Sequence, residues 1–209
     1  MSVLKTDILS FINEKQQLAE TVASIEDEIN EVLQDLGKRA LWPDLYRADV
    51  TADRGTLASG NKSISLPSGL RVLDFIVIND GTNDGEPLKV MTAEKWQRKR
   101  EDESTSNYDE PLRHVRRGKA WWPDPIPDGA YTAKYWFWRH HPKTSGATED
   151  ILFGDEFDLC IKYGVCAKVA STGGRSAYEA RWEPRYERQI RAMLPTANLK
   201  QTVCTFRDV

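Results

Sequence analysis

The chain has 209 residues, of which 40% are hydrophobic and 29% are charged, and its formal net charge at pH 7 is −3. This composition is close to the average of globular proteins and argues against a largely disordered chain, and the longest uncharged apolar run, residues 75–78, is far shorter than the roughly 18–20 residues that span a bilayer. The small negative charge gives no global attraction to nucleic acid or to an anionic membrane, so we expect one globular domain with an inserted lobe and no membrane partner.

The first 38 residues carry a helical pattern. Apolar residues recur there at spacings of three and four, at Leu4, Ile8, Phe11, Leu18, Val22, Ile25, Ile29, Val32 and Leu36. One long helix and two helices both fit this stripe, and the capping-box spacing of Ser24 and Asp27 favours two, over residues 4–20 and 24–38. The stripe is expected to face the core of its own chain, and a coiled-coil seam with another chain is the alternative.

A β-rich region follows Trp42-Pro43, where the proline ends the helical pattern. Short β-prone runs separated by turn residues predict a small, mostly antiparallel sheet with strands at 46–52, 61–66, 70–79, 87–91, 112–119 and 130–140. Asn79-Asp80-Gly81 supplies the positive φ that a reversal needs. Residues 92–100 predict a short helix with Thr92 as its N-cap.

Two more helices are predicted after Pro142, at residues 155–171 and 176–194, with Gly173-Gly174 between them and Pro195 closing the second. Residues 196–209 have no helical stripe and are expected to form an extended arm. The fold class is therefore predicted as α+β, a helical bundle of N- and C-terminal helices with an inserted small antiparallel β lobe. The expected divisions are 1–44 and 143–195 for the bundle, 45–142 for the lobe and 196–209 for the arm.

The sequence predicts neither a catalytic nor a metal site. Its three histidines are His114, His140 and His141, and an adjacent pair in a strand points to opposite faces, which is unsuited to one shared metal. The three cysteines have no CxxC spacing, and the usual hydrolase, protease and nucleotide-binding motifs are missing. We therefore expect a protein that is not an enzyme and has no cofactor.

Aromatic and basic residues of the β region predict a contact surface. Tyr135 and Phe137 alternate with Trp136 and Trp138, so this strand is apolar on both faces and is expected to be buried on both, under its own helices or against a neighbouring subunit. The candidate subunit-interface residues are Trp96, Trp121, Trp122, Trp136, Trp138, Arg116 and Arg117. A single-stranded nucleic-acid platform and a carbohydrate-binding surface are the alternatives for the same residues.

The last predicted helix carries charges of both signs. Its arginines, Arg181, Arg185, Arg188 and Arg191, are interspersed with Glu179, Glu183 and Glu187. Ion pairing at spacings of four along the helix is expected to account for them.

Four segments in order resemble the tailed-phage head-to-tail adaptor (connector) family, over about residues 24–192. They are Leu41-Trp42-Pro43-Asp44-Leu45-Tyr46, Ile64-Ser65-Leu66-Pro67-Ser68-Gly69-Leu70-Arg71, Pro87-Leu88 with a helix after it, and Trp122-Pro123-Asp124-Pro125-Ile126-Pro127-Asp128-Gly129-Ala130-Tyr131. The resemblance implies a structural virion protein that is made in the host cytoplasm and located at the head-tail junction.

The same resemblance implies the partners. It implies a ring of about twelve copies that docks on the portal, extends the DNA channel without binding DNA specifically and offers its lower face to a tail or nozzle protein. The helices would form the wall of the ring. The residues implied in portal docking are those of the expected arm, Leu199, Val203, Phe206, Arg207 and Val209.

Overall fold

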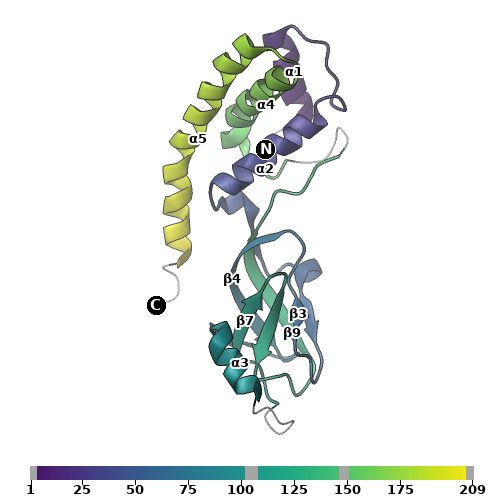
Figure 1. The fold of residues 1–209 in the computed structure, drawn as a ribbon, viewed down its shortest axis with the longest axis vertical. Helices are drawn as coiled ribbons and strands as arrows, with labels where there is room; N and C mark the ends of the chain where they lie inside the picture. Colours follow the sequence, from purple (N-terminus) through teal and green to yellow (C-terminus); the bar gives the residue numbers. More distant parts are fainter. Residues whose placement is uncertain (1–3, 102–107, 146–150, 206–209) are drawn as a thin grey trace. The chain divides into compact units, whose positions relative to one another are not determined.

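The computed structural model describes residues 4–101, 108–145 and 151–205, with the backbone alone for residues 100, 101 and 196–205. The chain is mixed α+β, as predicted, and divides into two compact units. A helical unit joins residues 1–46 to residues 140–209, and a β unit comprises residues 47–139. Figure 1 shows the helices of the first unit and the strands of the second.

Four α-helices make up most of the helical unit. They are α1 (Lys5–Gln16), α2 (Glu26–Arg39), α4 (Asp158–Thr172) and α5 (Ser176–Thr205), with short 3-10 turns at Pro43–Leu45 and Asp155–Phe157. The prediction of two N-terminal helices is confirmed, because Gln17 takes a positive φ of 53° and ends α1. The predicted capping box at the start of α2 is wrong, since the Ser24 hydroxyl bonds back to Glu20 and Thr21.

The core of the helical unit is built around α4, which packs against α1, α2 and α5 (Figure 1). Its buried residues include Ile161 and Val165 of α4, Leu33 of α2 and Trp182 of α5. Gln16, at the end of α1, donates from Nε2 to the Cys166 carbonyl at 2.8 Å. Among the described helices, none has both the length and the apolar character needed to cross a membrane.

The C-terminal segment differs from the prediction. We expected Pro195 to end the last helix and residues 196–209 to be extended, but α5 continues to Thr205 and contains both Pro184 and Pro195. A proline removes one backbone donor and displaces one carbonyl partner, and both prolines are exposed, so water can satisfy the carbonyl. The expected extended arm is therefore wrong for residues 196–205, and residues 206–209 lie outside the described residues.

The β unit has two sheets where one was predicted. The first has the order β1-β9-β4-β5 with β2 also paired to β9, and the second has the order β3-β8-β7-β6. The bounds are β1 Tyr46–Ala48, β2 Gly55–Leu57, β3 Ile64–Ser65, β4 Leu70–Asn79, β5 Asp84–Pro87, β6 Lys89–Val90, β7 Arg113–Arg117, β8 Ala120–Asp124 and β9 Tyr131–Arg139. The long pair β4 and β9 is antiparallel, and β6 pairs with β7 in parallel.

Local signals explain several elements of this unit. Asp80 Oδ1 accepts from the backbone N–H groups of Thr82 and Asn83 at 2.7 Å, and Gly81 has a φ of 99°, which together form the predicted turn between β4 and β5. The predicted short helix is α3 (Ala93–Glu101), and the Thr92 hydroxyl accepts from the Lys95 N–H at 3.4 Å, as expected of its N-cap.

Candidate interaction surfaces

The aromatic strand β9 builds the core of the β unit with one of its faces. Tyr135 and Phe137 are buried, and the Tyr135 hydroxyl accepts a hydrogen bond of 2.9 Å from Nε1 of Trp121 in β8. This bond joins the two sheets through their shared core. Trp121 has no exposed surface, so its predicted place in a subunit interface is corrected to a place in the core.

The other face of β9 is partly covered. Trp136 is half-buried and stacks on Phe75 of β4, with ring centroids 4.7 Å apart and planes at 17°. Trp138 is 7% exposed, so most of its surface is already buried within the chain. Of this pair, Trp136 therefore offers more surface to a partner.

Trp96, Trp122 and Arg117 form one cluster on the second sheet. The two indole rings meet edge to face at 5.9 Å, and the Arg117 guanidinium lies 5.5 Å from the Trp96 ring and 5.6 Å from the Trp122 ring. Both tryptophans are half-buried and Arg117 is exposed. The structure thus brings together three of the predicted interface residues from α3, β7 and β8, and a cation held between two rings is a common feature of contact surfaces.

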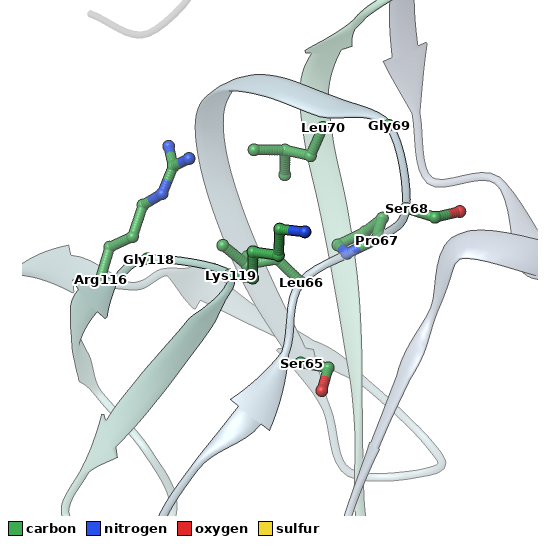
Figure 2. Close-up of a pocket in the computed structure, with 9 residues that line it drawn as sticks. All are labelled: Ser65, Leu66, Pro67, Ser68, Gly69, Leu70, Arg116, Gly118 and Lys119. Carbon is green, nitrogen blue, oxygen red and sulfur yellow. The ribbon is translucent and has the colours of Figure 1, made fainter. Parts of the chain in front are cut away.

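Arg116 and Lys119 lie beside an open hollow of about 410 Å³ in the same unit. Figure 2 shows the loop at residues 65–70 next to the β7–β8 turn, with Leu66 and Leu70 in the hollow and Arg116 at its side. Gly69 and Gly118 both take positive φ, of 76° and 58°, which these tight turns require. Leu66 donates its N–H to the Lys119 carbonyl at 2.9 Å, so the two loops are joined.

Three further basic residues near α3 are paired with carboxylates inside the chain. Lys99 and Arg113 both contact the Asp124 carboxylate, at 3.1 and 3.5 Å, and Arg98 pairs with Glu94 one turn away on α3. These pairs reduce the positive field that a phosphate backbone would meet.

The arginines of α5 are not paired in the way that the sequence suggested. Glu187 bonds Arg39 of α2 at 2.9 Å, and within the described residues neither Glu179 nor Glu183 forms an ion pair with an arginine. The predicted pairing along the helix is therefore wrong for the described residues.

His114 and His141 are both buried against other groups of the same chain. His114 is buried beside Trp121, and burial lowers its pKa below the usual value, an effect that the backbone hydrogen bond to Leu88 partly offsets. His141 is buried between two backbone groups, with Nδ1 at 2.7 Å from the Pro142 carbonyl and Nε2 accepting from the Leu152 N–H at 3.1 Å. Throughout the described parts of the chain, no group of three or more His, Cys, Asp or Glu residues is arranged to hold a metal ion.

The residues expected to dock on the portal fall at the end of the chain. Leu199 and Val203 belong to the helical backbone of α5, while Phe206, Arg207 and Val209 lie outside the described residues. The backbone of residues 196–205 is helical, whereas the sequence predicted an extended segment there.

A comparison with protein families finds one that spans both units. The family described as SU10 adaptor protein has a model that matches residues 2–203. No curated protein matches the chain.

Proposed function

Because the chain belongs to the SU10 adaptor protein family, whose role in the phage is structural, we propose that it forms a ring of about twelve copies at the head-to-tail junction, where it docks on the portal. The family match over residues 2–203 carries this proposal, since it includes both the helical unit and the β unit. The ring would continue the DNA channel from the portal and present its other face to a tail or nozzle protein.

The composition of the chain supports passage of DNA rather than tight binding to it. The net charge is −3, and residues 4–39 carry eight carboxylates against four lysines and arginines. A mildly acidic channel wall repels phosphates, which favours free movement of DNA through a collar.

The end of α5 is the segment that we propose to contact the portal. Residues 196–205 extend this helix beyond Ile190, whose side chain is the last fully buried one of the helical core along the chain, followed by the half-buried Met193 and Leu194. A helix that runs past its own core can pack against another protein. Leu199, Val203, Phe206, Arg207 and Val209 are the proposed contact residues.

Truncation tests this placement. A chain ending at Pro195 retains every residue of the helical core, so it should still fold and lose only the helical signal of residues 196–205. It should lose attachment to purified portal rings from the same phage in co-sedimentation. A chain ending at Thr205 tests residues 206–209 alone, and Lys62→Ala in the β unit serves as the control. Unchanged attachment of the chain ending at Pro195 would refute the placement of the contact.

A single-stranded nucleic-acid platform is the second candidate, and the Trp96–Trp122–Arg117 cluster favours it. In such a platform, the bases of a single strand stack on aromatic rings, and its phosphates contact arginine side chains. Fluorescence anisotropy with a labelled single-stranded oligonucleotide separates the two functions. Tight, salt-sensitive binding by the wild type that Arg117→Ala weakens at least tenfold would favour the platform. Weak binding by both the wild type and Arg117→Ala would favour the adaptor.

A further inference from the structure

The hollow between the loop at residues 65–70 and the β7–β8 turn combines apolar side chains with cations. Leu66 and Leu70 are half-buried in it, and Arg116 and Lys119 are exposed beside it (Figure 2). Among the described residues, no carboxylate lines the hollow and neither cation forms an ion pair. An apolar floor beside two such cations suits a partner that presents carboxylates.

The chain holds this hollow in shape by itself. Both leucines pack against the core of the β unit. Leu66 donates its N–H to the Lys119 carbonyl at 2.9 Å, and Leu70 donates its N–H to the Pro67 carbonyl at 3.4 Å. A surface that is already formed loses less conformational entropy when a partner binds to it.

Further positive charge lies at the same end of the β unit. Leu70 pairs with Arg139, the last residue of β9. Burial lowers the pKa of Arg139, the neighbouring Arg47 lowers it further, and Asp53 partly offsets these effects. Arg139 Nε is also buried without a hydrogen-bond partner among the described residues. A carboxylate brought to this end would therefore meet a net positive field.

The opposite end of β9 is acidic. Tyr131, the first residue of this strand, donates its hydroxyl to Asp128 Oδ1 at 2.6 Å. This hydrogen bond raises the pKa of Tyr131 to about 12, and burial and the charges of Asp128, Glu110 and Asp109 act in the same direction. Asp109 and Asp128 are exposed and Glu110 is half-buried. None of the three carboxylates forms an ion pair within the part of the chain that the structure describes.

Cations near the acidic end leave it with an excess of carboxylates. Lys62 lies in the loop after β2, a strand that pairs with the start of β9 at Tyr131. Lys99 and Arg113 belong to the neighbourhood of the second sheet, where both contact Asp124. The three carboxylates around the tyrosine therefore outnumber the lysine that the structure describes beside them.

The hollow and the acidic end cannot meet within one copy. Tyr131 and Arg139 are the first and last residues of β9, and at about 3.3 Å per residue they lie about 26 Å apart along the strand. An ion pair needs its charged atoms within about 4 Å of each other. Two unlike and complementary surfaces on one subunit let each copy bind the next head to tail, and such a contact forms a ring when its rotation closes.

We propose that the acidic end of the β unit, formed by Asp109, Glu110 and Asp128, docks on Arg116 and Lys119 at the hollow of a second copy of this chain. The inference rests on the proposed function and deepens it, because it names the surfaces through which neighbouring copies of the ring meet.

A second copy suits the hollow better than DNA does. Ala130 is exposed two residues after Asp128, so the acidic end offers an apolar group to the leucine floor as well as carboxylates to the cations. A DNA backbone would offer its phosphates to the cations alone, and the net charge of −3 on the chain opposes its approach.

Charge reversal tests the docking. Three full-length variants are mixed with portal rings: Arg116→Glu with Lys119→Glu, Asp109→Lys with Asp128→Lys, and all four changes combined. Mass photometry then counts the copies on each portal. Each reversal alone should reduce complete rings at least tenfold, and the combined exchange should restore them, because the two surfaces are again opposite in charge.

Controls separate this docking from general charge effects. Lys89→Glu with Lys95→Glu alters two exposed lysines of the β unit that do not line the hollow, and it changes the net charge by the same amount as the reversal at the hollow, so it should leave rings intact. Rings that survive either reversal, or that the combined exchange fails to restore, would overturn the proposal. Loss of binding to duplex DNA on the reversal at the hollow, with rings unchanged, would assign the hollow to DNA instead.

A second measurement does not depend on the portal. It uses a chain with Cys204→Ser, in which the two remaining native cysteines, Cys160 and Cys166, are buried. Adding Lys119→Cys and Asp128→Cys together and oxidising the chain at high concentration should give a ladder of linked copies on a non-reducing gel, and each change alone should give at most dimers.

The two measurements also separate this inference from the proposed function. The absence of a ladder would overturn the docking, even where the wild type still binds portal rings. A ladder from a chain whose wild type does not bind portal rings would contradict the proposed function and leave the docking standing.

Discussion

Trp121 and Trp122 are adjacent in β8 and have opposite roles. Trp121 is fully buried and bonds Tyr135, whereas Trp122 is half-buried in the cluster with Trp96 and Arg117. The sequence predicted both as interface residues, because a tryptophan rich in apolar surface fits a core and a contact surface equally well. Alternation along the strand assigns them to opposite faces, but only the pairing of β8 decides which face is the core.

Replacing each tryptophan by phenylalanine measures this difference. Trp121→Phe removes the donor to the buried Tyr135 hydroxyl and leaves unfilled space, and it should lower the free energy of unfolding by about 2–4 kcal/mol. Trp122→Phe keeps an aromatic ring at a half-exposed position and should cost less than about 1 kcal/mol. Urea unfolding followed by circular dichroism gives both values; equal costs would contradict the assignment of Trp121 to the core.

The buried His114 should make the stability depend on pH. Burial lowers its pKa in the folded chain, so the folded state favours neutral imidazole more than the unfolded state does. Its contribution should be fully present above the unfolded pKa of about 6.5 and should be lost as the pH falls through the folded pKa.

Urea unfolding curves between about pH 5 and 8 check this expectation. At about pH 8 the imidazole is neutral in both the folded and the unfolded state, so the free energy of unfolding there is the reference for its fall at lower pH. His114→Gln should flatten the fall below about pH 6.5, and His140→Gln, at an exposed position, should not. The same slope in wild type and His114→Gln would show that other groups control the acid response.

At the scale of the elements, the sequence predicted the helices better than the strands. Periodic apolar residues located α1, α2 and α4, and β4 has the predicted bounds, because these patterns are local. The strand β8 was missed, although Gly118 between two β-prone runs is a hairpin signal, and Arg117 pairs with Ala120 across that turn. The parallel pairing of β6 with β7 depends on distant segments and has no local signal.

The close packing of α4 gives a prediction at this scale. A methyl group at Gly164 would lie 2.8 Å from the Tyr186 ring of α5 and 2.8 Å from the Val32 side chain of α2. Gly164→Ala should therefore destabilise the helical unit by about 1–3 kcal/mol, even though alanine favours helix.

Ser171→Ala, at an exposed position of the same helix, is the matched control and should change the free energy of unfolding by less than about 0.5 kcal/mol. Thermal unfolding followed at a helix-sensitive wavelength compares the two variants. A stabilising effect of Gly164→Ala would mean that α2, α4 and α5 pack less closely than the structure shows.

At the scale of the whole molecule, the sequence could indicate an adaptor but not its contact faces. The order of the Trp-Pro, Leu-Pro and Pro-Asp-Gly segments carried the family resemblance, and the family match confirms it. The charges of α5 were interpreted as internal pairs because sequence spacing cannot show that Glu187 turns towards Arg39.

Salt should therefore act on the assembly and not on the fold. The Debye length falls from about 10 Å at 0.1 M salt to about 3 Å at 1 M, so exposed ion pairs between copies weaken over this range. Mass photometry of portal rings carrying the adaptor should show fewer copies per portal at about 1 M salt, while circular dichroism of the free chain stays unchanged because its two units have apolar cores. Rings that keep all their copies at high salt would show that apolar surfaces such as Trp136, and not exposed ion pairs, hold neighbouring copies together.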